Sequence, residues 1–327
     1  MLNFKVLMGC DPEFSFHNSH GKRIPANHFF GINSGDRTAM RSAIGHDGHR
    51  ETAEIRPKAC FSATSILLEI KRIILESVVL SKELERTQWL AKPVVEGNRG
   101  EEFQGGHVHF SFWSFLSDLQ IYRPIILNNL RCNRCGESIV ASIISALDNS
   151  INMPLITIAL GSSLAKMTEN EARVINTPER YRTQDSYSHF EWRTPQTWLV
   201  HPKLAFVFLA LAKSFIRTNL EKEIKDSAGD LSCNKWVKPI KCDHIKISSG
   251  NFLETIGKHL GDYYFPQIYV EKVRRALNFQ GEEVHLPGAI LKLRELNLPD
   301  LSDRDFKWNW ITLAEVKRVR KEFNIEV

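Results

Sequence analysis

The strongest constraint in this sequence is a set of short segments in which two polar side chains stand two positions apart, separated by an apolar residue or proline. In chain order the pairs are Asp11 and Glu13, His107 and His109, and Glu191 and Arg193. Residues i and i+2 of a strand point to the same face of a sheet, so each segment predicts a strand with one polar face. Carboxylates that share a buried face need cations to neutralise them, and hard divalent ions accept oxygen and imidazole ligands. The pattern therefore predicts a sheet that holds metal ions on one side.

Each segment also has an ordinary explanation when it is taken alone. The acidic pair at 11–14 is compatible with a turn at an edge strand whose carboxylates face water. The two histidines at 107–109 are compatible with an exposed strand, or with zinc. The segment 191–193 is compatible with a surface ion pair, which contributes little to stability. It is the combination of these segments with Asp47 and Glu54, around a further short strand, that favours a joint site.

Hydrophobic periodicity predicts an α+β fold. Strands are expected at 4–16, 52–57, 89–95, 107–112 and 188–193, and helices at 63–85, 117–130, 137–151, 202–225, 268–277 and 311–323. The stretch 17–48 is rich in Gly, Asn, His and Ser without periodicity, which predicts a long loop, and long loops in compact domains are often functional. The strands do not alternate regularly with helices, which favours a mixed or antiparallel sheet with helices on one side. We expect a main domain at 1–225 and a mainly helical accessory region at 226–327.

The composition excludes several classes of protein. The chain has 43 Lys and Arg against 38 Asp and Glu, a formal net charge of +5 without a block of like charges, so nucleic acid is not the expected partner. The longest apolar run, Leu204–Ala212, is far shorter than the ~20 residues of a membrane-spanning helix. Six cysteines without a secretory leader indicate reduced thiols. We therefore expect a cytoplasmic protein with no membrane partner.

Four of the cysteines allow a second interpretation. Cys132 and Cys135 have the spacing of a zinc knuckle, and Cys233 and Cys242 are candidates to complete a structural Zn²⁺ site. Such a site would clip the C-terminal region onto the main domain. The spacing of the second pair is wider than that of a knuckle, so buried reduced thiols are the alternative.

Four motifs follow one another in a fixed order along the chain. They are Asp11-Pro12-Glu13-Phe14, then Glu54-Ile55-Arg56-Pro57, then Gly105-Gly106-His107-Val108-His109, then Glu191-Trp192-Arg193-Thr194-Pro195. This order resembles the superfamily of glutamine synthetase and glutamate-cysteine ligase. Within it, the chain is most similar to the small carboxylate-amine ligases of bacteriophages and bacteria, the phage amidoligase type 2 group. The resemblance covers roughly the first two thirds of the chain, and its specificity lies in the four motifs together.

The resemblance implies two metal sites. The residues that resemble the ligands of the metal facing an acyl phosphate are Glu13, Asp47 and Glu54. The residues that resemble the ligands of the metal bridging the ATP phosphates are Asp11, His107 and Glu191. Asp11 and Asp47 stand where glutamine synthetase has Glu, and the shorter side chain leaves room for an intervening water. The expected ions are Mg²⁺ or Mn²⁺.

The resemblance also implies groups that bind phosphate. His109 resembles the phosphate-facing histidine of the family, and Arg193 resembles the arginine that holds the transferred phosphoryl group. Arg173 and Arg182 fall where the family has further arginines for phosphate or substrate. Arg193, Arg182 and Glu54 are the residues expected to take part in catalysis. The implied fold is a glutamine synthetase-like catalytic domain at 1–225, with a largely antiparallel curved sheet and helices packed on its outer face.

The implied activity is the ATP-dependent joining of a carboxylate to an amine, as an amide or peptide bond, through an acyl phosphate. The substrates would be small-molecule or peptide carboxylates and amines. Alternatives are a phosphotransferase of the guanidino kinase kind, a zinc hydrolase that uses His107 and His109, and a non-enzymatic scaffold whose basic C-terminal region binds nucleic acid or protein. No other nucleotide-binding signature competes, because the sequence has neither Gly-x-x-x-x-Gly-Lys-Ser/Thr nor Gly-x-Gly-x-x-Gly.

Overall fold

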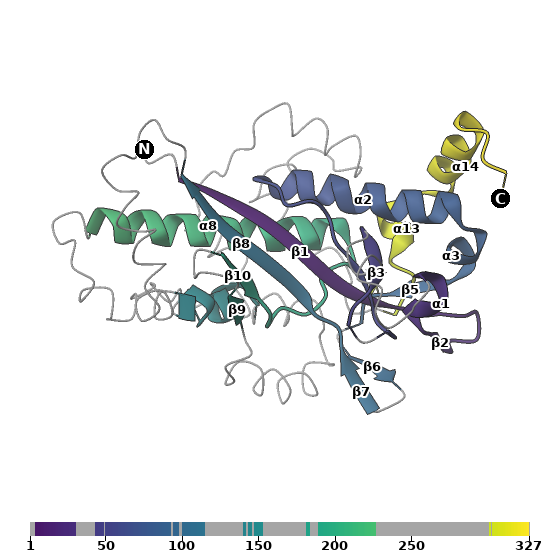
Figure 1. Ribbon diagram of the computed structural model, residues 1–327, viewed down its shortest axis with the longest axis horizontal. Helices are drawn as coiled ribbons and strands as arrows, with labels where there is room; N and C mark the ends of the chain where they lie inside the picture. Colours follow the sequence, from purple (N-terminus) through teal and green to yellow (C-terminus); the bar gives the residue numbers. More distant parts are fainter. Residues whose placement is uncertain are drawn as a thin grey trace.

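A computed structural model of the protein describes residues 4–30, 43–48, 50–92, 94–97, 100–114, 140–141, 143–145, 147–152, 181–183, 189–226, 301 and 303–326. Within these residues, two long helices, α2 (Ala63–Leu80) and α8 (Pro202–Asp226), run along one side of an antiparallel sheet (Figure 1). This arrangement confirms the predicted α+β class with helices packed on one face of a largely antiparallel sheet.

The main sheet has the strand order β3-β4-β1-β8-β10-β9, and all of these neighbours are antiparallel. Its strands are β1 (Phe4–His17), β3 (Ile44–His46), β4 (Ala53–Ile55), β8 (Gly106–Ser114), β9 (Tyr181–Thr183) and β10 (His189–Trp192). The far end of β1 also pairs with β2 (Arg23–Ile24) and β5 (Gln88–Leu90). A separate hairpin of β6 (Val94–Gly97) and β7 (Gly100–Phe103) projects from the sheet (Figure 1). The central strand β1 therefore touches several elements at once.

Aromatic residues on one face of the sheet form the core with the helices. Phe14, Phe110, Phe190 and Trp192 are fully buried. Trp192 stacks on Phe208 of α8, with the ring centroids 5.4 Å apart. Fully burying one large apolar side chain stabilises a fold by about 1.5–3 kcal/mol. The alternation that predicts the polar face thus also supplies the buried face, and burial of that face fixes the register of the strands.

The helix predicted at 63–85 is in fact two helices. α2 ends at Leu80, and α3 (Lys82–Arg86) begins after Ser81, whose backbone is extended. The Ser81 hydroxyl accepts a hydrogen bond from the backbone N–H of Leu84 at 3.2 Å. A serine that caps a new helix in this way interrupts the preceding one. The apolar periodicity continues into α3, and for this reason it concealed the break.

Other predicted elements are present with different boundaries. α8 matches the helix predicted at 202–225, and β8 is longer than the strand predicted at 107–112. The single strand predicted at 89–95 is wrong, because β5 and β6 are separate strands with different partners. The apolar pattern runs through both strands and does not show where one ends and the next begins.

The stretch 17–48 is not a simple loop in its described parts. It contains β2, the short helix α1 (Ala26–Phe30) and β3, which are too short to show a hydrophobic period. The helix predicted at 137–151 is helical where it is described and ends in the π-helical turn Asp148–Asn152. The helices predicted at 117–130 and 268–277 lie outside the described residues.

The described residues near the C-terminus pack on the main domain. They include α13 (Lys307–Trp310) and α14 (Leu313–Glu322), and α14 matches the helix predicted at 311–323. Trp310 joins the main hydrophobic core, and its Nε1 donates to the carbonyl of Leu199 at 2.7 Å. The boundary predicted between 225 and 226 stays a prediction. None of the helices that the structure describes combines the length and hydrophobicity needed to span a bilayer.

Candidate metal centre

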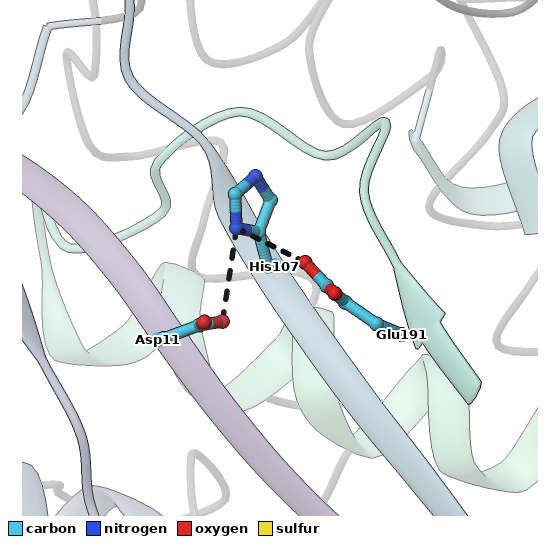
Figure 2. A group of neighbouring side chains, drawn as sticks. All are labelled: Asp11, His107 and Glu191. Atoms are coloured by element: carbon cyan, nitrogen blue, oxygen red, sulfur yellow. Dashed lines mark ion pairs between the residues drawn. The ribbon is translucent and has the colours of Figure 1, made fainter. Parts of the chain in front are cut away.

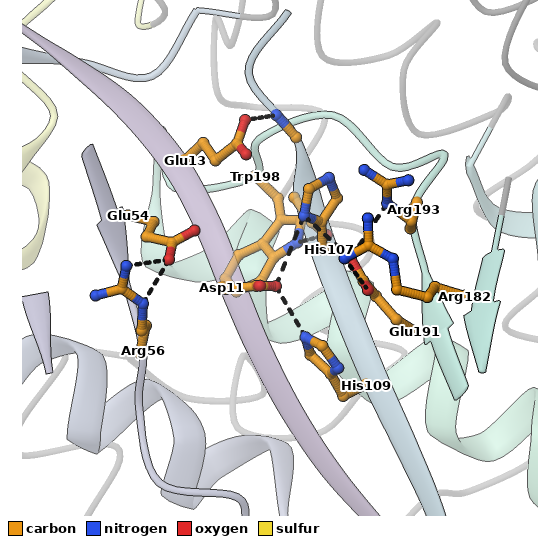
Figure 3. A network of polar contacts seen from close by, with 12 residues as sticks. Asp11, Glu13, Glu54, Arg56, His107, His109, Arg182, Glu191, Arg193 and Trp198 are labelled. Carbon is orange, nitrogen blue, oxygen red and sulfur yellow. Dashed lines mark hydrogen bonds and ion pairs between the residues drawn. The ribbon is translucent and has the colours of Figure 1, made fainter. Parts of the chain in front are cut away.

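The register of the sheet places the motif residues on one face (Figure 3). The directly opposed pairs are Asp11 with His107, His109 with Glu191, and Glu13 with Glu54. Residues that face each other across antiparallel strands project to the same side of the sheet. Four strands from distant parts of the chain thus present their polar groups together, opposite the face that packs on the helices.

Three of the predicted ligands converge on this face. One ligand atom from each of Asp11, His107 and Glu191 lies within 4.8 Å of the others, and Figure 2 shows the three side chains pointing toward one another. His107 Nδ1 is 3.8 Å from Asp11 Oδ1 and 3.5 Å from Glu191 Oε1. Burial lowers the pKa of His107, which favours the neutral imidazole that a metal requires. Two carboxylates and a neutral imidazole fit a hard divalent cation such as Mg²⁺ or Mn²⁺.

Glu13 of β1 and Glu54 of the neighbouring β4 form a second acidic group. The two residues are 7% and 9% exposed. Burial raises the pKa of Glu13 well above its usual value, and the charge of Asp47 adds to this effect. Burial also raises the pKa of Glu54 to about 8, with Arg56 opposing the shift and Asp11 and Asp47 adding to it. Buried carboxylates that repel one another would be stabilised by a cation.

The second predicted ligand set is less tightly assembled than the first. Among the described residues, the only three groups with ligand atoms mutually within reach of one ion are Asp11, His107 and Glu191. Asp47 acts on Glu13 and Glu54 through its charge. A metal held by Glu13, Asp47 and Glu54 therefore stays a prediction.

Two residues without a predicted role hold these carboxylates in place. Arg56 donates to Glu54, and its Nη2 also donates to the carbonyl of His46 at 2.6 Å. The backbone N–H of Gly105 donates to Glu13 Oε2 at 2.6 Å. The alternation of the strand gives a signal for Arg56, since it stands two positions after Glu54 and shares its face. The contact of Gly105 depends on the pairing of β1 with β8, which the sequence alone does not reveal.

Basic side chains border the triad of possible metal ligands, Asp11, His107 and Glu191 (Figure 3). His109 Nε2 is 3.1 Å from Asp11 Oδ1. Burial alone would lower the pKa of His109, but the hydrogen bond and the charge of Asp11 outweigh it and raise the pKa. Arg193 Nε is 3.3 Å from Glu191 Oε1, and Arg182 Nη1 is 3.8 Å from Glu191 Oε2. The Arg182 side chain is 63% exposed, so it is accessible to a ligand. Cationic donors beside a metal centre suit a phosphate group.

Several predicted site residues lie outside the described residues. They are Arg173 and the four cysteines of the zinc hypothesis, Cys132, Cys135, Cys233 and Cys242. Their roles stay predictions.

A cavity of about 270 Å³ opens beside the triad. Its lining includes Gly9, Asp11, Arg56, His109, Ser111 and His189. Asp11 and His109 belong both to this lining and to the polar network of the triad. A ligand in the cavity would therefore lie next to Asp11 and His109.

The fold and the site together define the class of protein. It is built on an antiparallel sheet that helices cover on one face and that presents carboxylates, imidazoles and arginines on the other. In sequence, residues 8–123 match the family of phage phiEco32-like COOH.NH2 ligases, type 2. This match confirms the predicted resemblance to a carboxylate-amine ligase of the phage type 2 group over that range. The range includes the first three motifs, and the motif that begins at Glu191 lies beyond it. No curated protein matches the chain.

Three solved structures that align with this chain are as follows. A novel glutamine synthase homolog has a TM-score of 0.43 at 13% identity, covering 98% of this chain and 71% of its own. PafA, the ligase of the prokaryotic ubiquitin-like protein Pup, has a TM-score of 0.43 at 11% identity, covering 98% and 70%. A bifunctional glutathione synthetase from Pasteurella multocida has a TM-score of 0.44 at 13% identity, covering 98% and 53%. The fold class rests on the sheet topology and not on these low scores.

Proposed function

We propose that this protein is an ATP-dependent carboxylate-amine ligase that forms an amide or peptide bond through an acyl phosphate, with two divalent metal ions. The observation that carries the proposal is the convergence of Asp11, His107 and Glu191 on one face of the sheet, bordered by His109 and Arg193. The family match over residues 8–123 supports it, because that range contains Asp11, His107 and His109 and the family is one of carboxylate-amine ligases.

The proposed metal ligands form two sets. Asp11, His107 and Glu191 would hold one ion next to the ATP phosphates. Glu13, Asp47 and Glu54 would hold the other, and a bound cation would offset the burial and the repulsion that together raise the pKa values of the two glutamates. The chemistry that bound Mg²⁺ or Mn²⁺ supplies is neutralisation of phosphate charge, so that an anionic carboxylate can approach.

The first step would make the carboxylate reactive. One of its oxygens forms a bond to the γ-phosphorus of ATP, while the bond from that phosphorus to the bridging oxygen breaks and ADP leaves. Arg193 would hold the transferred group with its planar guanidinium, and His109, whose pKa Asp11 raises, would donate to a phosphate oxygen. Because phosphoryl transfer depends on positioning and charge neutralisation, these contacts account for most of what the protein must supply.

The second step would form the amide. The amine nitrogen attacks the acyl carbon, the bond from that carbon to the phosphate oxygen breaks, and the proton of the amine leaves with inorganic phosphate. The cavity beside His109 offers room for the part of the nucleotide next to the phosphates, and the exposed Arg182 for the anionic end of a substrate. The substrate class is that of small-molecule or peptide carboxylates and amines.

Incubation of the purified protein with ATP, Mg²⁺ or Mn²⁺, and a mixed pool of amino acids and peptides tests the proposal. A ligase releases ADP and inorganic phosphate in equal amounts and forms a product whose mass is the sum of two substrates less one water. Glu191→Gln should lose this turnover. Glu69→Gln is the matched control, because this glutamate pairs with Arg72 on α2, away from the site. Phosphate retained on an acceptor would indicate a phosphotransferase, and no ATP turnover with either ion would refute the proposal.

A further inference from the structure

A buried carboxylate contacts β10 from the core side of the sheet. Asp148 begins the π-helical turn Asp148–Asn152 and is 1% exposed. Its Oδ1 accepts a hydrogen bond from Trp192 Nε1 at 2.8 Å and a second one from the hydroxyl of Thr194. Turns of this kind are rare and occur frequently at functional sites. No step of the proposed reaction uses Asp148 directly.

The two residues that Asp148 binds alternate with two residues of the site. Trp192 and Thr194 are buried. Glu191 and Arg193 lie on the polar face of the sheet, with Arg193 Nε 3.3 Å from Glu191 Oε1. Fixing one set of alternating side chains of an extended chain therefore fixes the other set on the opposite face.

Asp148 holds the chain at the place where β10 ends. Among the described residues, β10 ends at Trp192, which is also its last residue to pair with β8. Backbone pairing resumes at Pro195, whose carbonyl accepts from the N–H of Gly106 at 2.7 Å. Thr194 lies in the gap, where Asp148 binds its hydroxyl and the Asn152 side chain donates to its carbonyl at 3.3 Å.

We infer that Asp148 is a positioning residue of the ligation site: through Trp192 and Thr194 it sets the placement of Glu191 and Arg193. The inference rests on the proposed function, which makes Glu191 a metal ligand. A carboxylate suits this task because one of its oxygens accepts two hydrogen bonds, and its charge strengthens both. Removal of groups that orient metal ligands weakens metal affinity or activity by about 10–100-fold.

Substitutions at Thr194 test this with little change of shape. Thr194→Val removes the hydroxyl, whereas Thr194→Ser keeps it. Thr197→Val is the matched control, because Thr197 is also buried, at 7% exposure, and its hydroxyl has no hydrogen-bond partner among the described residues. Asp148→Asn keeps the size of the side chain and removes its charge.

The readout is Mn²⁺ affinity, measured by calorimetry without nucleotide, together with kcat and the melting temperature. We expect Thr194→Val and Asp148→Asn to bind Mn²⁺ about 10–100-fold more weakly than the unmodified protein. Thr194→Ser and Thr197→Val should bind it with nearly unchanged affinity. A merely structural role would lower the melting temperature of Thr194→Val without changing its Mn²⁺ affinity.

Unchanged Mn²⁺ affinity in Thr194→Val overturns the inference, and if Asp148→Asn fails to fold, the comparison of Thr194→Val with Thr194→Ser decides. If the unmodified protein binds Mn²⁺ but never turns over ATP, the proposed function fails, while the Mn²⁺ titrations still judge Asp148. If the unmodified protein binds no Mn²⁺, the metal centre and the inference fail together.

Discussion

Gly105→Ala would show whether His107 has to keep its position. A Cβ atom built on Gly105 lies 2.2 Å from Nε2 of His107 and 2.7 Å from its Cδ2, whereas ordinary contacts begin at 3.4 Å. The backbone of Gly105 is held by its hydrogen bond to Glu13, so the imidazole has to move, by on the order of 1 Å in a closely packed site. Metal sites tolerate deviations of only about 0.2 Å, so a shift of this size takes His107 out of the triad.

The effect on stability should be small in comparison. The φ angle of Gly105 is not positive, so alanine fits its backbone and gains about 0.4–1 kcal/mol from the unfolded state. Against this stands about 0.5–1.5 kcal/mol for an imidazole held away from its preferred rotamer. We expect the free energy of unfolding to change by less than about 1 kcal/mol, while Mn²⁺ affinity and kcat fall about 100-fold.

Mn²⁺ calorimetry and urea unfolding of the same samples separate these two effects. Gly9→Ala is the control for Mn²⁺ binding, because its Cβ would meet the Cβ of His109 at an ordinary 3.6 Å. Gly106→Ala is the contrast, because its Cβ would lie 2.2 Å from the carbonyl oxygen of Gln196 and force the backbone apart, which costs about 1–3 kcal/mol of stability. Folded Gly105→Ala protein that binds Mn²⁺ as tightly as the unmodified protein would refute the reasoning.

Three further changes probe charge and support around the site. Burial raises the pKa of Glu54 to about 8 from 4.5, so between these two pH values the metal-free folded state keeps a proton that the unfolded state has released. The stability that this proton contributes is therefore lost as the pH rises from 4.5 to about 8. The unfolding free energy of the unmodified protein relative to Glu54→Gln, measured in urea at each pH, should therefore fall across this window, and a flat difference would contradict the shift. Arg193→Lys keeps the charge but loses the planar donor geometry, so kcat should fall without a change in melting temperature; unimpaired kcat would remove Arg193 from the mechanism. Lys307→Met should destabilise the protein by about 3–5 kcal/mol in thermal or urea unfolding, because fully buried Lys307 pairs with Asp305 and donates to the carbonyl of Thr87 at 2.6 Å. A loss below about 1 kcal/mol would show that Asp305 finds another partner.

The polar face of the sheet could be predicted from the sequence because strand alternation is a local property. Asp11 and Glu13 share a face whatever β1 pairs with, and the same holds for His107 and His109. The register is not local. That Asp11 lies opposite His107 depends on the pairing of β1 with β8, which is fixed by burial of residues such as Phe110 and by distant connections.

The supporting contacts were hidden from the sequence for the same reason. Asp148 meets Trp192 and Thr194 across more than forty positions of the chain, and nothing near Asp148 in the sequence marks it as a partner of β10. The break at Ser81 was visible only as a serine in an apolar periodic stretch, where such a residue is often tolerated. Elements such as β2 are held by their pairing with β1 and not by a period of their own.

Strand geometry also bears on how many ions the face can hold. Successive residues of a strand rise by about 3.3 Å, so the backbones of Asp11 and Glu13 are separated by roughly 6–7 Å along β1. The carboxylate of Asp11 meets His107 and His109 of β8, whereas Glu13 pairs through its backbone with Glu54 of β4 and its carboxylate accepts from the backbone N–H of Gly105. These separate neighbours support the proposal that Asp11 and Glu13 bind different ions. The proposed pair of metal positions thus needs only one central strand with a neighbour on each side, and the segment Asp11-Pro12-Glu13 is the local feature of the sequence that the proposal requires.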